Sequence, residues 1–359
     1  MEKKALIAMS GGVDSSVAAL LCQQAGFDCM GVTLKLYDNE DAGLPREKTC
    51  CSVDDVADAR SVAFRLGMPF YVFNFKEAFR REVMDRFVQA YERGETPNPC
   101  VDCNRYIKFE KLMRRGEEVG FPYIATGHYA RVEFDGAAGR WLLKKGLDEN
   151  KDQSYMLWSL TQWELSRLLL PLGGLTKERV RQLAEEHGFL NARKRDSQDI
   201  CFVPDGDYAA FIRRYAGKEF PPGAFVGTQG QVYGQHKGII HYTVGQRKGL
   251  GLSFPQPMFV KELDVEKNRV VLAKAEELFS QEVIARDINL ISVESIPAPL
   301  RVKARVRYRQ KEQPATVLQT GPGELRVVFD QPQRAVTPGQ SLVLYDGDTV
   351  VGGGKIARK

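Results

Sequence analysis

The chain of 359 residues lacks the long apolar run that a membrane span requires. Its opening apolar stretch, residues 5–9, is also too short for the hydrophobic part of a secretory signal. The sequence contains neither a Walker A loop ending in GKS or GKT nor a GxGxxG dinucleotide fingerprint. Internal repeats, low-complexity tracts and long blocks of like charge are missing as well. These absences predict a globular chain without a membrane partner and exclude two familiar nucleotide-binding loops.

Neither sign of charge is in large excess, since the net charge is only +5. A nucleic-acid partner must therefore be sought in local basic patches rather than in the total charge. Seven cysteines without a recognisable signal peptide are typical of a reducing compartment. A cytoplasmic location is therefore expected.

Residues 10–16 read SGGVDSS and lie between a predicted buried strand, residues 5–9, and a helical pattern. The two glycines let main-chain N–H groups approach an oxyanion closely, and the helix N-terminus adds partial positive charge. The three serines are hydroxyl donors, and Asp14 is suited to hold Mg²⁺ or to cap the helix. The alternative is a plain strand-to-helix turn with a serine cap. We interpret the segment as a phosphate-binding loop.

This heptad resembles the pyrophosphate loop of the N-type ATP pyrophosphatases. The resemblance implies cleavage of ATP between the α and β phosphates, adenylation of a substrate oxygen and displacement of AMP by a nucleophile. The group includes amidotransferase-linked synthetases and tRNA thiolases, and the loop alone does not choose among them.

Strand and helix signals alternate in the first part of the chain. Apolar strand candidates are residues 5–9, 29–36, 70–73 and 123–126, and helical periodicity covers residues 54–66 and 76–93. This alternation predicts an α/β fold with a doubly wound parallel sheet, whose ligands lie at the carboxyl ends of the strands.

The character of the sequence changes twice after this region. Residues 166–215 are helical and basic, and glycine-punctuated strands follow Pro221. From Ile291 onward apolar and polar residues alternate, which is typical of a small closed barrel. We predict three domains, at residues 1–165, 166–287 and 288–359.

Three cysteines stand in settings that favour chemistry. Residues 96–109 read TPNPCVDCNRYIKF and place Cys100 and Cys103 in a CxxC motif, while the distant RDSQDICFV adds Cys201. Arg105, Lys108 and Arg195 are sequence-near cations that favour a thiolate. Three readings stay open beside inert burial: a redox pair with sulfur transfer, a three-thiolate iron–sulfur site, and a structural zinc site.

Residues 303–311 read KARVRYRQK, with a cation at every second position. On a strand all five cations point to one face, which suits RNA phosphates. The alternative is an edge strand whose charges prevent aggregation. The five cations are Lys303, Arg305, Arg307, Arg309 and Lys311.

Seven motifs, in this order along the chain, together resemble the tRNA-specific 2-thiouridylases: SGGVDSS, TPNPCVDCNRYIKF, TGHYAR, KDQSYMLW, RDSQDICFV, HYTVGQRKGLG and VTPGQ. The resemblance implies a pyrophosphatase (HUP-like) domain, a small mixed central domain that binds tRNA, and a C-terminal β-barrel. It implies ATP and Mg²⁺ as cofactors. It also implies two partners, tRNA and a protein that donates persulfide or sulfide.

The family's functional residues carry over by motif. Cys103 matches the nucleophile, Cys201 matches the persulfide carrier, and Asn98, Pro99 and Cys100 match the loop that receives the target base. Positions that match ATP contacts are Ala8, Met9, Ser10, Gly11, Gly12, Val13, Asp14, Ser15, Leu34 and Gly127. Positions that match tRNA contacts are His128, Lys151, Asp152, Gln153, Arg307, Tyr308 and Gln340. On sequence grounds alone, His128 equally suits a packed polar residue, and residues 151–153 equally suit a helix start with a cap.

Cys100 departs from the family pattern, because many members have an aspartate at this position. The thiol either takes over proton transfer or joins Cys103 and Cys201 as a third ligand of an iron–sulfur cluster. Cys50 and Cys51 accompany this variant, and a simple loop is the alternative for them.

The resemblance implies that a flipped-out wobble uridine is adenylated at its C2 oxygen and that sulfur then replaces AMP. The sulfur comes either from a persulfide on Cys201 or from hydrosulfide on a cluster. Two rival functions are a small-molecule amidoligase of the same superfamily and a non-enzymatic, metal-stabilised tRNA-binding protein. The first needs neither the three cysteines nor the basic segment.

Overall fold

The computed structural model describes residues 2–38, 53–194 and 199–358. The chain forms two compact units. The first contains Met1–Val83, Cys100–Gly206 and Asp348–Val350, and the second contains Met84–Pro99, Asp207–Gly347 and Val351–Lys359.

A five-stranded sheet of order β3-β2-β1-β4-β7 forms the centre of the first unit, and every adjacent pair of strands is parallel. The strands are β1 (Lys4–Ala8), β2 (Asp28–Lys35), β3 (Phe70–Asn74), β4 (Tyr123–Ala125) and β7 (Leu168–Leu169). The predicted parallel sheet is confirmed, and four of its strands lie within two residues of their predicted bounds.

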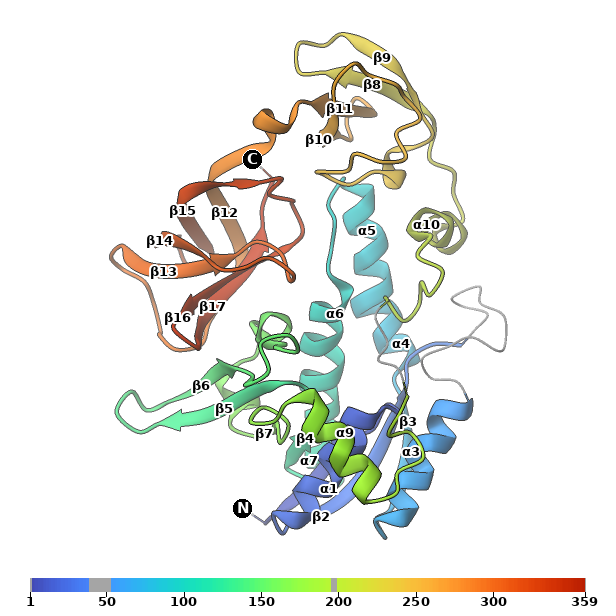
Figure 1. Ribbon diagram of the computed structural model, residues 1–359, viewed down its shortest axis with the longest axis vertical. Coiled ribbons are helices and arrows are strands. Elements are labelled where there is room, and N and C mark those ends of the chain that lie inside the picture. Colours follow the sequence, from blue (N-terminus) through green and yellow to red (C-terminus); the bar gives the residue numbers. More distant parts are fainter. Residues whose placement is uncertain (1, 39–52, 195–198, 359) are drawn as a thin grey trace. The chain divides into compact units, whose positions relative to one another are not determined.

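Helices cover both faces of this sheet (Figure 1). On one face α1 (Val13–Gln24) packs with α3 (Val53–Arg65) and α9 (Lys177–Glu186), and apolar side chains of all three join Ala5 and Ile7 in one core. On the other face Leu6 points toward α7 (Leu112–Glu118). Alternate residues of β1 therefore face opposite helical layers, as a doubly wound sheet requires.

The predicted helix over residues 76–93 is wound in three pieces: α4 (Lys76–Phe79), the π-helical η1 (Arg80–Asp85) and α5 (Arg86–Glu92). A second π-helical segment, η2 (Cys103–Lys111), joins α6 (Pro99–Asp102) to α7. π-Helical turns are rare and often occur at functional sites, so the start of η2 at Cys103 marks that residue. The remaining elements of this unit are the hairpin β5 (Ala130–Asp135) and β6 (Arg140–Lys145), η3 (Ser154–Leu157) and α8 (Gln162–Leu165).

The second unit, to which α5 belongs, contains a small mixed sheet of order β10-β11-β8-β9. Its strands are β8 (Gly223–Gly227), β9 (Val232–His236), β10 (Phe259–Asp264) and β11 (Arg269–Ala273), and the short helices are α10 (Tyr208–Ala216), η4 (Ile239–His241) and η5 (Ala275–Leu278). The change to short strands after Pro221 is thus confirmed.

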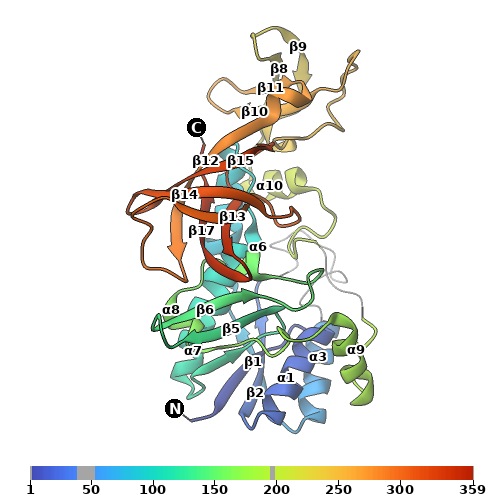
Figure 2. The ribbon, with the colours of Figure 1, turned by 60° about the vertical axis from the view of Figure 1, so that its left-hand side comes forward.

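Six antiparallel strands close into a barrel in the same unit, coloured orange to red in Figures 1 and 2. They are β12 (Phe279–Leu290), β13 (Leu300–Arg305), β14 (Gln313–Gly321), β15 (Glu324–Arg334), β16 (Ser341–Asp346) and β17 (Thr349–Ile356). The order β12-β15-β14-β13-β16-β17 returns to its start because β12 also pairs with β17. Alternate apolar residues such as Val302, Ala304 and Val317 fill the interior. The predicted barrel is confirmed, and its first strand begins at Phe279.

Candidate active site

The loop between β1 and α1 is shaped by its two glycines. Gly11 has a φ of +74°, and a Cβ atom there would lie 2.4 Å from the carbonyl oxygen of Asp55. No side chain fits this position, because the backbone conformation and the contact with α3 both exclude one. Gly12 occupies the N-cap position of α1 and supplies no capping side chain. The first N–H groups of the helix are therefore not covered by a cap and are oriented as an anion site requires.

The serines of the loop hold its shape. The Ser15 hydroxyl donates to the Gly12 carbonyl at 3.0 Å and accepts the Ser10 N–H at 3.2 Å. The Ser16 hydroxyl donates to the same carbonyl at 3.1 Å. The hydroxyl protons of Ser15 and Ser16, expected as phosphate donors, are thus used within the loop, and main-chain N–H groups remain the donors for an anion.

Asn191, which is distant from this loop in the sequence, also anchors it. It was not among the predicted site residues. Its Nδ2 atom donates to the Gly11 carbonyl at 3.0 Å and to the Ser16 hydroxyl at 2.9 Å. The side chain is buried, and its Oδ1 atom has no hydrogen-bond partner among the described residues. One asparagine therefore fixes both ends of the turn.

Asp14 neither caps α1 nor stands alone as a metal ligand. Its carboxylate accepts two hydrogen bonds from the Lys177 ammonium, at 2.7 and 2.8 Å, and one from the Tyr129 hydroxyl at 2.7 Å. Lys177 is almost fully buried and is the first residue of α9. A buried lysine held by one carboxylate fixes the start of α1 against α9. The pairing of Lys177 with Asp14 could not be predicted from the sequence, because the two residues are 163 positions apart.

Gly127 lies against the phosphate loop. A Cβ atom at this position would come within 2.7 Å of the Asp14 carbonyl carbon and 2.8 Å of the Ser15 nitrogen. Leu34, expected on the adenine side, is buried in β2. On the neighbouring position of that strand, the Thr33 hydroxyl donates to the Met9 carbonyl at 2.7 Å. These contacts bring the ends of β1, β2 and β4 together at the carboxyl edge of the sheet.

His128 is a buried side chain rather than an exposed one. Its Nδ1 atom lies 2.8 Å from the Thr126 hydroxyl, and its ring packs near Phe109. Burial, together with the positive charge of Lys108, holds the pKa of His128 well below its ordinary value. The imidazole is therefore neutral at physiological pH.

Residues 151–153 fold into a turn beside Tyr129. The Gln153 side chain accepts the Tyr129 N–H, and the Tyr129 carbonyl accepts the Gln153 N–H, both at 2.9 Å. The buried Asp152 carboxylate accepts from the N–H groups of Gly146 and Ser154 and from the Ser154 hydroxyl. These bonds hold the tyrosine whose hydroxyl reaches Asp14.

Cys103 is buried at the start of η2. Burial raises the pKa of its thiol to about 11, an effect that the positive charge of Lys108 opposes. The neighbouring Asn104 donates to the Met156 carbonyl at 3.2 Å, and its buried Oδ1 atom has no partner within the described part of the chain. In this arrangement the thiol is protonated at neutral pH and needs a base or a change of surroundings to react.

Cys100 and Cys201 are more accessible than Cys103. Cys100 is exposed on α6, and Cys201 is partly exposed. The Tyr37 hydroxyl donates to the Cys201 carbonyl at 2.6 Å, and the next residue, Phe202, packs edge-on against Phe79. The Cys201 segment is thus fastened to the sheet unit by its backbone, which leaves the accessible thiol at the end of a fixed segment.

The three cysteines do not form a metal-ligand set. Across residues 2–38, 53–194 and 199–358, no three histidine, cysteine or acidic side chains are grouped so as to hold a metal ion. The expected iron–sulfur ligands Cys100, Cys103 and Cys201 therefore do not fit a preassembled cluster site. Cys50 and Cys51 lie outside the described residues.

Two predicted RNA contacts of the second unit, Arg307 and Gln340, share a hydrogen-bond network through Thr337, whose carbonyl accepts the Gln340 N–H at 3.2 Å. The Gln340 side chain donates to the Thr96 carbonyl at 2.6 Å, and the Thr96 N–H donates to the Pro338 carbonyl at 2.9 Å. These bonds link the barrel to the segment that leads into Asn98 and Pro99. The Arg307 guanidinium donates to the Ala335 carbonyl and, at 3.2 Å, to the Thr337 hydroxyl.

The prediction that residues 303–311 form one strand with five aligned cations is wrong. Strand β13 ends at Arg305, and a turn follows in which Tyr308 is partly exposed. Arg305 forms a 2.8 Å ion pair with Glu312 and lies over the Tyr345 ring. Val302 and Val306, which alternate with these cations, are buried in the barrel core. The five cations do not share one exposed face, because the strand ends at Arg305 and Arg305 pairs with Glu312.

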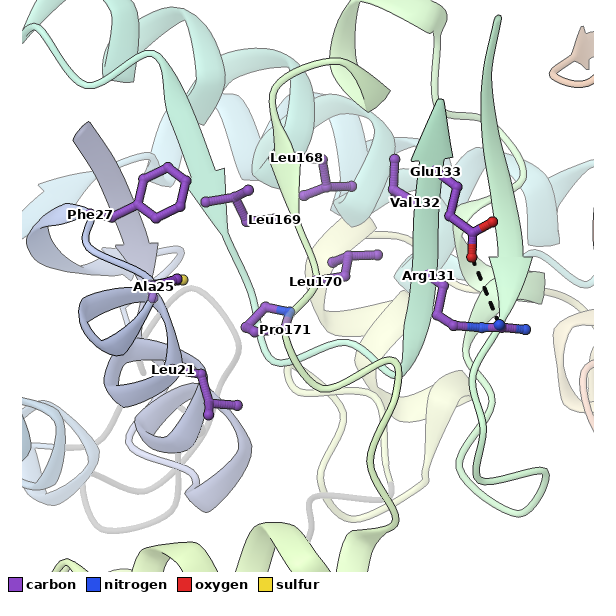
Figure 3. A pocket seen from close by; sticks show the side chains of 11 residues that line it. Leu21, Ala25, Phe27, Arg131, Val132, Glu133, Leu168, Leu169, Leu170 and Pro171 are labelled. Carbon is purple, nitrogen blue, oxygen red and sulfur yellow. Dashed lines mark ion pairs between the residues drawn. The ribbon is translucent and has the colours of Figure 1, made fainter. Parts of the chain in front are cut away.

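A separate pocket of about 320 Å³ lies at the opposite end of α1 from the phosphate loop (Figure 3). Leu21, Phe27 and Leu169 are among its mostly apolar lining residues, and Arg131 and Glu133 form an ion pair at its edge. It contains none of the predicted site residues. Within the described ranges, no helix is both long and apolar enough to span a membrane.

Three families match successive parts of the chain. The family described as tRNA methyl transferase HUP domain matches residues 3–205, more than half of the chain. The tRNA methyl transferase PRC-barrel domain matches residues 209–274, and the Aminomethyltransferase beta-barrel domain matches residues 280–356.

Full-length relatives give a sharper comparison. The chain is 50% identical over 358 residues to a protein of Clostridioides difficile (strain 630) named tRNA-specific 2-thiouridylase MnmA, covering 100% of this chain and 99% of the relative. It is 51% identical over 357 residues to tRNA-specific 2-thiouridylase MnmA 1 of Thermoanaerobacter sp. (strain X514), covering 99% and 98%. A relative of the same name as the first, from Acetivibrio thermocellus (strain ATCC 27405), is 50% identical over 356 residues, with 99% of each chain covered.

Proposed function

Because this chain belongs to the tRNA-specific 2-thiouridylase family, we propose that it uses ATP to convert the wobble uridine of tRNA to 2-thiouridine. The observation that carries the proposal is the set of functional groups that the first unit contains. One compact body holds the phosphate loop, the accessible Cys100 and Cys201 and the buried Cys103. A small-molecule amidoligase needs the loop but has no use for the thiols.

In the first step the pyrophosphate part of ATP lies on residues 10–16, and the C2 oxygen of the uridine attacks the α-phosphorus. Pyrophosphate leaves, and the uridine becomes adenylated. The N–H groups at the start of α1 stabilise the charge on the phosphates, because they are oriented before the substrate arrives. Leu34 contacts the adenine. Gly127, whose main chain lies close to the start of α1, also contacts the nucleotide.

Magnesium fits this step as part of the ATP substrate rather than as a resident ion. The Asp14 carboxylate already accepts from Lys177 and Tyr129, and magnesium sites normally use carboxylates together with substrate phosphates. We propose that Asp14 positions the loop through Lys177 and that the metal arrives with the nucleotide.

In the second step the terminal sulfur of a persulfide on Cys201 attacks C2 of the adenylated uridine. AMP leaves with the former C2 oxygen. The Cys103 thiol loses its proton to solvent once the bound substrate has changed its surroundings, and the thiolate attacks the Cys201 sulfur. The bond between the two persulfide sulfurs breaks, so the transferred sulfur stays on the base and a Cys103–Cys201 disulfide forms. Two electrons from a reductant restore both thiols, which suits a reducing compartment such as the cytoplasm.

We favour the persulfide over the cluster because the three thiols do not form a ligand set in this fold. Cys100 is exposed on the helix that leads to Cys103. In this proposal its thiol transfers a proton to or from the target base. Asn98 and Pro99 receive that base. His128, residues 151–153, Arg307, Tyr308 and Gln340 complete the tRNA-binding residues, some of them by holding neighbouring groups in place. A separate protein supplies the persulfide.

The test is single-turnover thiolation with ATP, Mg²⁺, a persulfide-loaded donor protein and unmodified tRNA, after anaerobic purification and iron and zinc analysis. We expect equal amounts of AMP and 2-thiouridine from metal-free protein. Cys201→Ser should release pyrophosphate but leave the base unthiolated. Unimpaired product formation by Cys201→Ser would favour the amidoligase. Activity that strictly follows iron content would favour the cluster, and tRNA binding without pyrophosphate release would favour the non-enzymatic function.

A further inference from the structure

The loop over residues 243–251, TVGQRKGLG, is part of a family motif to which the function above assigns no role. We call it the glycine loop. It connects η4 to the segment before β10 in the second unit, and it carries two adjacent cations, Arg247 and Lys248, at its tip. Hydrogen bonds and three glycines define the path of its main chain.

Gln246 holds the loop from inside. Its side-chain oxygen accepts the Thr243 N–H at 3.0 Å, and its Nε2 atom donates to the Lys248 carbonyl at 3.0 Å. The main chain is joined to β10 as well, because the Gly245 N–H donates to the Val260 carbonyl at 2.7 Å and the Val260 N–H donates to the Gln246 carbonyl at 2.9 Å. Four hydrogen bonds thus fix the backbone on both sides of the two cations.

Left-handed backbone conformations complete the turn. Gly245, Gly249 and Gly251 have φ values of +89°, +77° and +70°. Side chains rarely adopt this region, so the three glycines allow a tight path that other residues would strain. The chain uses this path to present Arg247 and Lys248 outward, and both are exposed.

Neither cation forms an ion pair within the part of the chain that the structure describes. Several arginines of the second unit do form ion pairs: for example, Arg213 pairs with Glu219, and Arg305 pairs with Glu312. In the described ranges no carboxylate lies within ion-pair distance of Arg247 or Lys248. Because hydrogen bonds hold its main chain, the loop loses little backbone entropy when its two cations bind an anion.

The base of the loop lies beside a predicted RNA contact. A Cβ atom on Gly245 would lie 2.9 Å from the Ala335 Cβ and 3.6 Å from the Arg307 Nη2. Arg307 in turn donates to the Ala335 carbonyl. The glycine loop therefore adjoins Arg307, which family resemblance links to tRNA, and adds two exposed cations to the same unit.

We propose that the glycine loop is a tRNA phosphate-binding element in which Arg247 and Lys248 contact the backbone of the bound tRNA next to the Arg307 contact. The inference rests on the proposed tRNA substrate and adds a site to it. Phosphate contacts position an RNA without reading its sequence, so this loop contributes to affinity and orientation and not to the choice of base.

The test compares the double variant Arg247→Gln/Lys248→Gln with a matched control, Lys267→Gln/Arg269→Gln. The control removes two exposed cations from the same unit. The tRNA dissociation constant is measured at several salt concentrations, with thiolation kinetics in parallel. For the loop variant we expect binding about 10- to 100-fold weaker at low salt, and a plot of log affinity against log salt that is shallower by about 2.

The loop variant should also show a raised KM for tRNA with an unchanged kcat at saturating tRNA. The control should match the wild type in both assays, and equal thermal midpoints would show that all proteins are folded. If the loop variant retains the wild-type affinity and salt slope, or changes no more than the control, the inference is overturned. If instead the wild-type protein neither binds tRNA nor thiolates it, the proposed function fails together with the inference.

Discussion

Asp14 and Lys177 form an ion pair at the start of α1, with Lys177 nearly buried and Asp14 less so. A carboxylate beside a phosphate site repels the triphosphate unless a cation balances it. The pair therefore allows an acidic residue within a loop that must bind anions.

Lys177→Met should raise the KM for ATP at least 10-fold and lower the free energy of unfolding by about 1–3 kcal/mol, because the remaining carboxylate is uncompensated. Asp14→Asn/Lys177→Met removes both charges and should recover part of each loss. ATP kinetics and denaturant unfolding of both variants and of Asp14→Asn give the coupling energy of the pair. Strictly additive effects in the double variant would argue against the charge balance.

Gly127 has a matched control elsewhere in the first unit. Gly127→Ala places a Cβ atom within 2.7 Å of the Asp14 backbone, whereas a Cβ atom on Gly174 meets nothing within 4 Å. We expect Gly127→Ala to lose about 1–3 kcal/mol of stability and to bind ATP more weakly, because the start of α1 must move. Gly174→Ala should behave as the wild type in thermal unfolding and in ATP titration. Equal behaviour of the two variants would contradict the close contact.

The Cys103 thiol should react slowly at neutral pH, because burial raises its pKa to about 11. The rate of its alkylation by iodoacetamide, followed by mass spectrometry, should increase as the pH rises toward 11 in protein without ATP or tRNA. Lys108→Met removes the charge that lowers this pKa, so its profile should shift to still higher pH. Lys111→Met, in the same π-helical segment, serves as the control. A midpoint near 8.5, or equal profiles for the two lysine variants, would contradict this assignment.

Among the elements, β13 carries two cations with different surroundings, Lys303 and Arg305. Lys303 is exposed on the strand, whereas Arg305 pairs with Glu312, with 17% and 10% of their side chains exposed. The exposed cation is available for RNA, and the buried one stabilises the barrel.

Arg305→Met should destabilise the protein by about 2–4 kcal/mol, because Glu312 would keep a largely buried charge without its partner. The salt dependence of tRNA binding should remain that of the wild type. Lys303→Met, as the comparison, should leave stability within about 0.5 kcal/mol of the wild type. Thermal unfolding and salt-dependent tRNA titration check both statements. A flatter salt slope for Arg305→Met with unchanged stability would show instead that Arg305 contacts a phosphate.

At the scale of the whole molecule, the chain crosses between its two units several times, so sequence position does not equal unit membership. Helix α5 belongs to the second unit, where Phe87 and Tyr91 pack against Tyr208, and Phe87 also packs against Phe211 of α10. The Tyr215 hydroxyl donates to Asp85 at 2.6 Å.

A chain that ends at Gly206 keeps α5 but loses α10. We expect this fragment to bind a hydrophobic dye and to aggregate, because Phe87 and Tyr91 are nearly fully buried in the intact chain. Phe87→Gln/Tyr91→Gln in the same fragment should reduce both effects. Dye fluorescence and light scattering measure them. A fragment that stays monomeric and binds no dye would show that the first unit folds without this contact.

Much of the architecture followed from local pattern. The strands at residues 5–9, 29–36 and 70–73 were predicted because buried strands are short and apolar, and the helix over residues 54–66 because its apolar period is helical. The π-helical breaks at Arg80 and Cys103 were not predicted, since a one-residue change in winding leaves no mark on that period. The roles of the candidate cysteines remain predictions.

The sequence by itself determined which segments become strands and helices, where the phosphate loop lies and which thiols deserve attention, because these depend on the periodicity of neighbours and on glycine's freedom of backbone conformation. Only the tertiary structure decided that Lys177 balances Asp14, that Asn191 anchors the loop and that Arg305 turns inward to Glu312. The reason is physical. A charge or a polar group forms its hydrogen bond or ion pair with a partner that packing brings within about 3 Å, and that partner is often distant in sequence.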